Sequence, residues 1–163
     1  VARHDGSWTH MDKAFKRAEG LLENWMKEHH DKDCYPPTII NITDGEYNGT
    51  SYDEMQQLAN QLKSMFTNDG NVLLFNIHVV PEHAESVVFP ATVDELNGNG
   101  YGKKLYEMSS LLPLNYNEQI RNIFGDKQAD IRYRAMGVNT GMERLVKMMK
   151  IGTLSRMLAN QNP

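Results

Sequence analysis

The sequence contains a single cysteine, Cys34. One thiol cannot form an internal disulfide, so no disulfide framework holds this chain together, and nothing in its cysteine content indicates an oxidising compartment. Positive charge is also sparse, since 17 Lys and Arg stand against 21 Asp and Glu and leave a net charge of −4. Without a dense basic cluster, the sequence lacks the electrostatic footprint of proteins that bind nucleic acid or anionic membranes.

Long hydrophobic runs are missing as well. The longest apolar stretch, Val72–Val80, is interrupted by Asn76 and His78. It is far shorter than the roughly 20 apolar residues that cross a bilayer as a helix. No signal peptide is visible, although the sequence opens at Val1 rather than at a methionine. From these absences we expect a cytoplasmic protein that does not enter a membrane.

The motifs of several common enzyme classes are absent too. The sequence has no P-loop and no Gly-x-Gly-x-x-Gly, and Ser109-Ser110 lacks the flanking glycines of a nucleophile elbow. The overall composition is that of a globular protein, with 163 residues, 40% hydrophobic and 23% charged. A chain of this length buries a substantial core, and we expect residues 1–163 to form one domain.

The first half of the chain has the pattern of a βαβ unit. After a predicted helix over Met11–His29, a β-branched strand is predicted at Ile39–Thr43 and a strand buried on both faces at Val72–Val80. Between them, Ser51 and Glu54 fit a capping box. The apolar stripe of the helix that follows contains Met55, Leu58, Ala59, Leu62, Met65 and Phe66. Strand, helix and strand at this spacing predict a parallel sheet.

The second half is less regular. We expect a helix over Tyr101–Ser110, a shorter helix near Asn117–Phe124 and an edge strand at Ala135–Asn139. A last helix is marked by Met142, Leu145, Val146 and Met149, and most of the ten methionines are expected in the core. The predicted fold class is α/β, with a Rossmann-like, mostly parallel sheet and helices on both faces.

Asp44 is the main candidate for a functional residue. It directly follows the Ile39–Thr43 strand. Open parallel sheets bind ligands beyond the carboxyl ends of their strands, at a topological switch point. A simpler interpretation is that Asp44-Gly45 only forms a turn. The spacing alone does not distinguish this turn from a ligand-binding site.

The segment Ile40–Glu46, which contains Thr43-Asp44-Gly45, resembles a von Willebrand factor A (VWA) domain. In that family a strand ending in Thr-Asp-Gly supplies the last acidic residue of a metal-ion-dependent adhesion site. Upstream, Asp5–Met11 is similar to the family's Gly-x-Thr-x-Met loop, whose threonine contributes a hydroxyl to the same metal. The resemblance therefore implies that Thr9 and Asp44 are metal ligands.

The likeness extends over nearly the whole chain, through Asp69–Asn76, Leu105–Pro113 and Met148–Thr153, and is to stand-alone bacterial VWA proteins. The family's first motif, Asp-x-Ser-x-Ser on the central first strand, is not found in these residues. We therefore expect the N-terminal part of the domain to be missing and a gap beside the Ile39–Thr43 strand. Another polypeptide segment or a second copy of the chain would complete the sheet.

The function implied by the resemblance is that of a metal-assisted protein-binding module, not an enzyme. A divalent ion, Mg²⁺ with Mn²⁺ or Ca²⁺ as alternatives, would be held by Thr9 and Asp44 and would accept a carboxylate from a protein partner. Two ligands alone would hold it weakly. Two alternatives remain open: a metal-dependent hydrolase that uses Asp44 with Glu46 or a histidine as base, and a scaffold with a vestigial metal site.

The histidines offer a further metal-site hypothesis. His29, His30, Asp31, Asp33 and Cys34 have the residue types of a transition-metal cluster, but they fall where a helix is predicted to end. Imidazoles are favoured there by the helix dipole, so a solvated helix end is the preferred interpretation. His78, within the buried strand, is expected to be a hydrogen-bonded core histidine.

Overall fold

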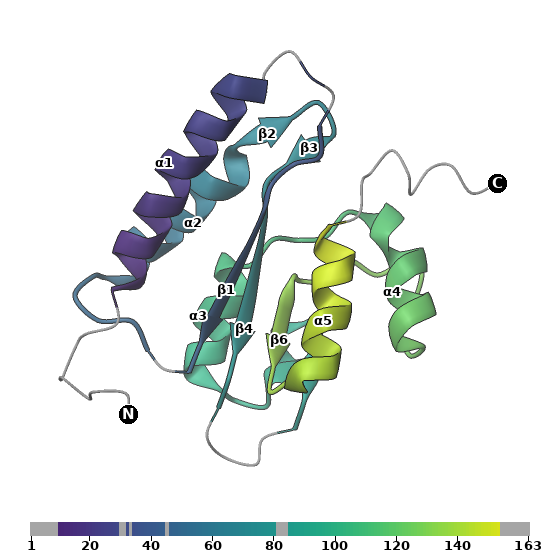
Figure 1. Cartoon of the computed structure of the whole chain (residues 1–163). Helices are drawn as coiled ribbons and strands as arrows, with labels where there is room; N and C mark the ends of the chain where they lie inside the picture. The colour runs from purple at the N-terminus through teal and green to yellow at the C-terminus, as the bar shows by residue number, and fades with distance from the viewer. Residues whose placement is uncertain (1–9, 30–31, 33, 45, 81–84, 154–163) are drawn as a thin grey trace.

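The computed structural model describes residues 10–29, 32, 34–44, 46–80 and 85–153. Within these ranges the chain forms a four-stranded sheet of order β1-β4-β6-β5 with helices on both faces (Figure 1). The strands are β1 (Thr38–Thr43), β4 (Leu73–His78), β6 (Met136–Val138) and β5 (Val87–Val88). The first three are parallel and β5 runs antiparallel to β6. The predicted α/β class and mostly parallel sheet are confirmed.

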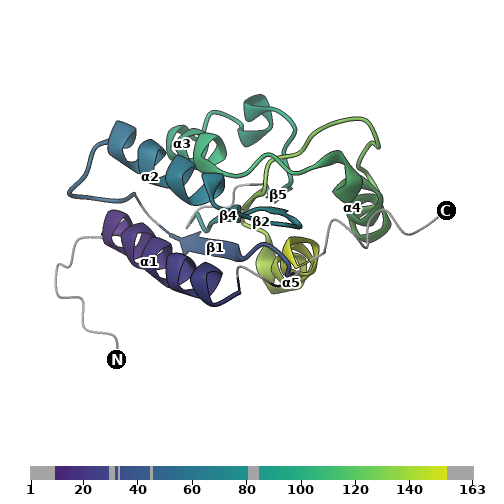
Figure 2. The same ribbon diagram turned by 90° about the horizontal axis from the view of Figure 1, so that it is seen from above.

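Helices cover the two faces of the sheet unequally. Figure 2 shows α2 and α3 on one side of β1 and β4 and α5 on the other, while α1 lies beside β1. The helices are α1 (Met11–His29), α2 (Tyr52–Ser64), α3 (Gly100–Met108), α4 (Asn117–Phe124) and α5 (Gly141–Gly152). Short 3-10 turns, η1 (Val93–Leu96) and η2 (Leu114–Tyr116), precede α3 and α4. In the part of the chain that the structure describes, no helix is long and apolar enough to cross a membrane.

The β1-α2-β4 crossover confirms the predicted βαβ unit. β1 and β4 pair in parallel register, with Thr38 opposite Leu73. α2 begins at the predicted capping box, where the Glu54 backbone N–H donates to Ser51 Oγ at 3.2 Å and the Ser51 N–H donates to Glu54 Oε2 at 2.9 Å. This reciprocal pair satisfies two backbone donors that a helix start otherwise leaves open.

The predicted end of α2 is wrong. The helix stops at Ser64, and Phe66 is 72% exposed on a short antiparallel hairpin of β2 (Phe66–Thr67) and β3 (Gly70–Asn71). The turn of this hairpin uses a φ of 141° at Gly70, a value that suits glycine. Phe66 is apolar and in helical register with α2, so the sequence pattern places it on the helix. Strands of only two residues leave no alternation in the sequence that would reveal the hairpin.

The core is built around β4, all of whose residues are buried, as predicted. Leu74 packs with residues of α2 and α3, whereas Phe75 and Ile77 pack with α5. The alternation follows from the pleat, which directs successive side chains to opposite faces.

β6 is not the edge strand that the sequence predicts, because it lies between β4 and β5. The two-residue strand β5, which covers its outer side, is too short to give a signal in the sequence. All of Met136, Gly137 and Val138 are buried. A Cβ on Gly137 would lie 2.4 Å from Thr140 Cγ2 and 2.9 Å from Met148 Sδ, so the close packing of α5 on β6 requires glycine there.

The apolar residues that mark the last helix are largely exposed. Met142 is 75% exposed, and Val146 and Met149 are also exposed, whereas Met148 and Ile151 form the buried face of α5. The expectation that the methionines fill the core is therefore wrong for Met142 and Met149. α5 carries apolar residues on two faces, and helical spacing does not show which face meets the sheet.

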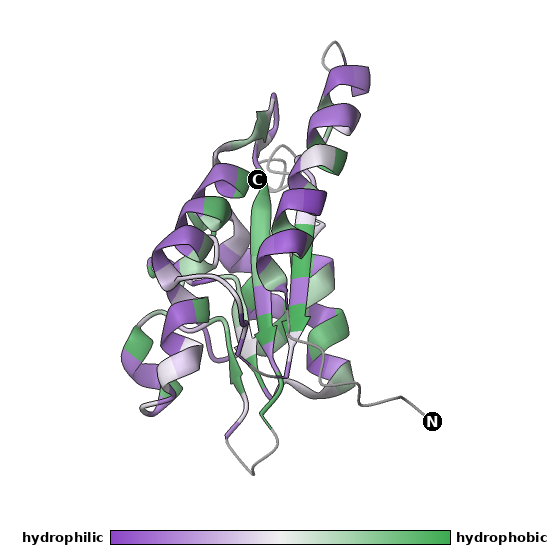
Figure 3. Ribbon diagram, turned by 90° about the vertical axis from the view of Figure 1, so that its left-hand side faces the viewer, coloured by the Kyte–Doolittle hydropathy of each residue, from purple (hydrophilic) through white to green (hydrophobic). Residues whose placement is uncertain are grey.

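β1 lies at the edge of the sheet and, among the described residues, pairs only with β4. Ile42, which projects from β1 toward the α5 side, is 54% exposed. Figure 3 looks onto this edge and shows apolar strands between helices with hydrophilic outer surfaces. In the described part of the chain, the side of Ile39–Thr43 that faces away from β4 is therefore unpaired. That this side is a gap left by a missing strand, and what would fill it, stays a prediction.

Candidate functional site

The carboxyl ends of β1, β4 and β6 meet at one edge of the sheet, which we call the carboxyl edge. Backbone hydrogen bonds extend the pairing past the strands, from Val79 N–H to Thr43 O at 2.8 Å and from Asn139 N–H to His78 O at 2.9 Å. Asn139 also accepts from the Val80 N–H at 2.7 Å through its side chain. The loops that leave the three strands are therefore held together.

Asp44 is exposed at the carboxyl edge, directly after β1. Its carboxylate has no hydrogen bond or ion pair with any described residue. Among the described residues, Asp44 therefore presents an unpaired carboxylate at the strand end. A turn aspartate that serves only its own loop commonly bonds to the backbone two residues on, and no such bond forms within the described part of this loop.

Thr9, the second predicted ligand, lies outside the described residues. The helix that follows it begins beside β1, since Asn41 Nδ2 lies 3.7 Å from Met11 Sδ. Met11 and Phe15 are buried together with residues of α2. The start of α1 thus reaches the same strand that carries Asp44.

The position of Asp44 relative to a topological switch point differs from the expectation. β1, β4 and β6 follow one another in a single direction across the sheet, and among the described strands the order reverses only at β5, on the side of β6 away from β1. A switch point beside Asp44 would need a further strand on the free side of β1.

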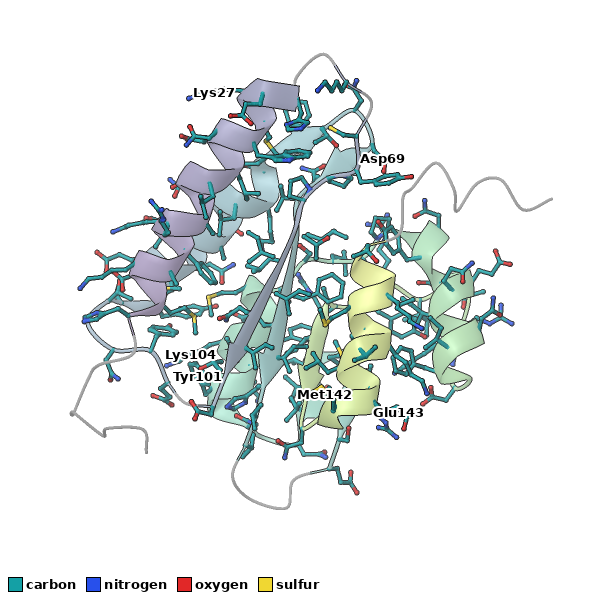
Figure 4. The ribbon with its side chains drawn as sticks, viewed as in Figure 1. Lys27, Asp69, Tyr101, Lys104, Met142 and Glu143 are labelled. Carbon is teal, nitrogen blue, oxygen red and sulfur yellow. The ribbon has the colours of Figure 1, made fainter. Side chains whose placement is uncertain are left out.

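Thr43, the last residue of β1, is buried, and so is Tyr101, which lies near this end of the strand (Figure 4). Burial raises the pKa of Tyr101 to about 12, so its hydroxyl stays protonated at neutral pH. The Tyr101 ring lies 5.8 Å from the ring of Tyr47 and 5.2 Å from that of His78. Tyr101 therefore joins the ring of Tyr47, from the segment after β1, to that of His78 at the end of β4.

His78 is buried and hydrogen-bonded, as predicted. Asn99 Oδ1 accepts from the Gly102 N–H at 2.7 Å at the start of α3, and this bond directs Asn99 Nδ2 toward His78 Nδ1 at 3.3 Å. The amide donates, so Nδ1 is the unprotonated nitrogen and the ring proton is on Nε2. Burial lowers the pKa of His78, with the nearby Glu46 charge acting in the opposite direction.

The lowered pKa of His78 predicts an acid-sensitive stability. The unfolded chain binds a proton near the ordinary pKa of 6.5, whereas the folded chain stays neutral to a lower pH. Stability is therefore highest above this value and falls as the pH drops below it. We expect the melting temperature of His78→Phe to fall less between pH 7.5 and 5.5 than that of the unsubstituted protein. Parallel curves would contradict this assignment.

A buried polar network in the sheet is an addition to what the sequence predicts. Asn76 accepts from Asn41 Nδ2 at 2.8 Å and donates to Ser109 Oγ at 3.0 Å and to Leu105 O at 3.2 Å. Asn76 is fully buried, so these bonds offset the cost of removing its amide from water. The only sequence signal for this network is an asparagine inside an apolar strand.

Neither serine of the Ser109-Ser110 pair is available as a nucleophile. Ser109 Oγ donates to Leu105 O at 2.7 Å, and Ser110 Oγ accepts from the Leu74 N–H at 2.8 Å. Both residues are buried. Their hydroxyls join the start of β4 to the end of α3, which is a structural role.

Comparison with family models, with curated proteins and with solved structures finds no match. The function of this chain is therefore inferred from its own geometry and from the resemblance of its motifs.

The second metal-site hypothesis concerns the end of α1. His29 Nδ1 is 2.7 Å from Trp25 O, its ring stacks on Trp25 at 4.4 Å, and Cys34 Sγ is 4.0 Å from His29 O. His30, Asp31 and Asp33 lie outside the described residues. Across the described ranges, no three His, Cys, Asp or Glu side chains are grouped so as to hold a metal ion. The described part of this segment has the contacts of an ordinary helix end.

Proposed function

We propose that the chain is a metal-assisted protein-binding module of the VWA kind. Asp44, with Thr9, holds a divalent ion above the carboxyl end of β1, and an acidic side chain of a protein partner completes the coordination. The observation that supports this most directly is the exposed carboxylate of Asp44 at the end of a parallel strand, which has no partner in the described ranges. Mg²⁺ is the expected ion, with Mn²⁺ or Ca²⁺ as alternatives.

The coordination chemistry explains why such a site binds a partner. Mg²⁺ prefers an octahedron of oxygen ligands and retains water readily. A shell with one carboxylate and otherwise neutral hydroxyls and waters leaves much of the ion's charge uncompensated. A partner carboxylate that replaces one water therefore gains a strong electrostatic contact.

The shell is incomplete with Thr9 and Asp44 alone, and the unpaired side of β1 supports a way to complete it. β1 carries no charged residue and no proline. Charged residues and prolines are features by which natural edge strands avoid pairing with a further strand. Ile42 on β1 exposes apolar surface as well. We propose that a further strand pairs with β1 there and brings the remaining metal ligands next to Asp44.

A metal-dependent hydrolase is the less favoured alternative. Glu46 is exposed near Asp44, but Ser109 and Ser110 are buried and engaged in hydrogen bonds. A binding module has no turnover, so hydrolysis of generic ester and phosphoester substrates with Mg²⁺ or Mn²⁺ should stay at the rate of buffer alone. Turnover that is lost in Asp44→Ala and in Glu46→Ala would support the hydrolase instead.

A scaffold with a vestigial metal site would bind its partner with or without a metal ion, and this distinguishes it from a metal-assisted binding module. Partner binding, measured by capture from extract, should disappear with EDTA and return with added Mg²⁺. Binding that persists unchanged in EDTA would favour the scaffold.

A further inference from the structure

A groove away from the Asp44 site is lined by residues of α5 together with residues of α4, η1 and β5. α4 and α5 lie side by side (Figure 1), and we call this hollow the α4–α5 groove. Its volume is about 530 Å³, within the range of roughly 300–1,000 Å³ that is usual for small-molecule sites. Asp44 does not line it, so the groove has no part in the proposed metal site.

Part of the lining of the α4–α5 groove is apolar. Val87 and Val88 come from β5, and Ile123 and Phe124 come from the end of α4. The Phe124 ring meets the buried ring of Phe89 edge-on at 5.5 Å, and this contact holds it in place. A ligand with an apolar body would gain affinity here in proportion to the apolar surface that it covers.

Two of the three acidic residues that line the groove are already engaged. Glu143 Oε1 accepts from Lys147 Nζ at 2.7 Å, and this bond lowers the pKa of Glu143. Glu95 Oε1 accepts from two backbone N–H groups ahead of η1, at 2.7 and 3.0 Å. The third acid, Asp126, is exposed just after α4. A ligand cation would therefore find one carboxylate in the groove that has no partner among the described residues.

Two of the three basic residues that line the groove contact no carboxylate in the described part of the chain. Arg144 Nη1 donates to Ser86 Oγ at 3.1 Å, and this bond holds the guanidinium against another lining residue. Lys127 Nζ donates to Phe89 O at 3.3 Å and lies 5.2 Å from the centre of the Tyr133 ring. Both acceptors are neutral oxygens, so neither cation has its charge compensated by a bonded acid. The remaining N–H groups of a guanidinium match the two oxygens of a carboxylate.

We infer that the α4–α5 groove binds a small carboxylic acid with an apolar body. The carboxylate accepts from Arg144, and the apolar body packs on β5 and on the end of α4. A single negative charge suits the groove better than the double charge of a phosphate, because Glu95 and Asp126 also line it. The inference goes beyond the proposed protein-binding function and does not depend on it.

The probe for this inference is 4-methylpentanoate at pH 7.5, in buffer with EDTA. Its addition should shift the backbone resonances of Val87, Val88 and Arg144 in a saturable way in ¹H–¹⁵N NMR spectra. Two analogues separate the contributions of charge and apolar surface, since 4-methylpentanamide keeps the apolar body without the charge and acetate keeps the charge without the body. Each should bind at least about tenfold more weakly, the loss expected for a charge-assisted hydrogen bond or for several methylene groups.

Leucine identifies the source of the carboxylic acid. It has the same carboxylate and apolar body as 4-methylpentanoate and adds an ammonium group. Tighter binding of leucine, with the advantage lost in Asp126→Asn, would support an amino acid as the ligand. Weaker binding of leucine would support an acid without an amino group.

Arg144→Gln tests the proposed anchor directly. It should weaken 4-methylpentanoate at least about tenfold and leave 4-methylpentanamide unchanged, because the amide has no charge for the guanidinium to bind. Arg121→Gln is the matched control, since it removes the same charge from an exposed position of α4 that does not line the groove. Both substituted residues are exposed, so both variants should melt at the normal temperature. Shifts that never saturate, equal affinities for the acid and its amide, or equal losses in Arg144→Gln and Arg121→Gln would each overturn the inference.

Discussion

Asp44→Ala should abolish divalent-dependent partner binding, with a loss of at least about tenfold, while the protein melts at its normal temperature. The carboxylate is the one charged ligand that we assign to the ion, so its removal takes away a direct metal contact. Because Asp44 is exposed and unbonded among the described residues, its side chain contributes little to packing, and surface substitutions of this kind change stability by about 0.5 kcal/mol or less. Binding is measured by capture from extract with and without EDTA, beside thermal melts.

Glu46→Ala is the matched control for this experiment. It removes the same charge two residues along the same exposed loop, but not a proposed ligand. Partner binding should survive it. Thr9→Ala should weaken binding more mildly than Asp44→Ala, since it deletes one neutral oxygen ligand. If Asp44→Ala melts far below the unsubstituted protein, Asp44 is structural, and if it keeps every EDTA-sensitive partner, the metal assignment is wrong.

Phe75→Ala should have the largest effect on stability, about 3–5 kcal/mol. Phe75 is fully buried in the centre of β4, its ring meets that of Phe89 edge-on at 6.1 Å, and Gly152 of α5 packs closely against it. Truncation removes these contacts and leaves a cavity between the sheet and α5. Denaturant unfolding of the variant gives the change directly.

Phe66→Ala is the control for Phe75. It removes the same side chain from the β2–β3 hairpin, where the ring is exposed, and should change the free energy of unfolding by about 0.5 kcal/mol or less. Similar losses for both variants would show that Phe75 does not anchor the core in the way that its burial indicates.

The long elements of the fold are predictable because each gives a periodic or capping signal. The bounds of α1 and the capping box of α2 are as predicted, and β4 is buried on both faces. The two-residue strand β5 and the β2–β3 hairpin give no such signal, because strands this short have no measurable alternation. Without them, β6 has the pattern of an edge strand and Phe66 that of a buried helix residue.

Some residues of the candidate site can likewise be predicted from the sequence and others cannot. The position of Asp44 is predictable because the strand ends at Thr43, but its role as a metal ligand stays a prediction. The burial of His78 is predictable because the strand around it is apolar. The buried partners of His78 are not predictable, since Asn99 reaches it only through the local geometry at the start of α3. The outer face of α5 is misassigned because its methionines follow helical spacing on both faces, and spacing does not specify which face meets the sheet.

The most direct test of the proposed metal site is a calorimetric Mn²⁺ titration of two forms of the protein. One is the 163-residue chain, and the other carries an apolar strand with an Asp-x-Ser-x-Ser motif joined to Val1 by a flexible linker, which keeps the strand at high local concentration. We expect weak binding by the first form, binding at least about tenfold tighter by the second, and loss of the gain in Asp44→Ala. Micromolar affinity in the chain alone, or a gain that survives Asp44→Ala, would contradict a site built on Asp44 and completed by a strand beside β1.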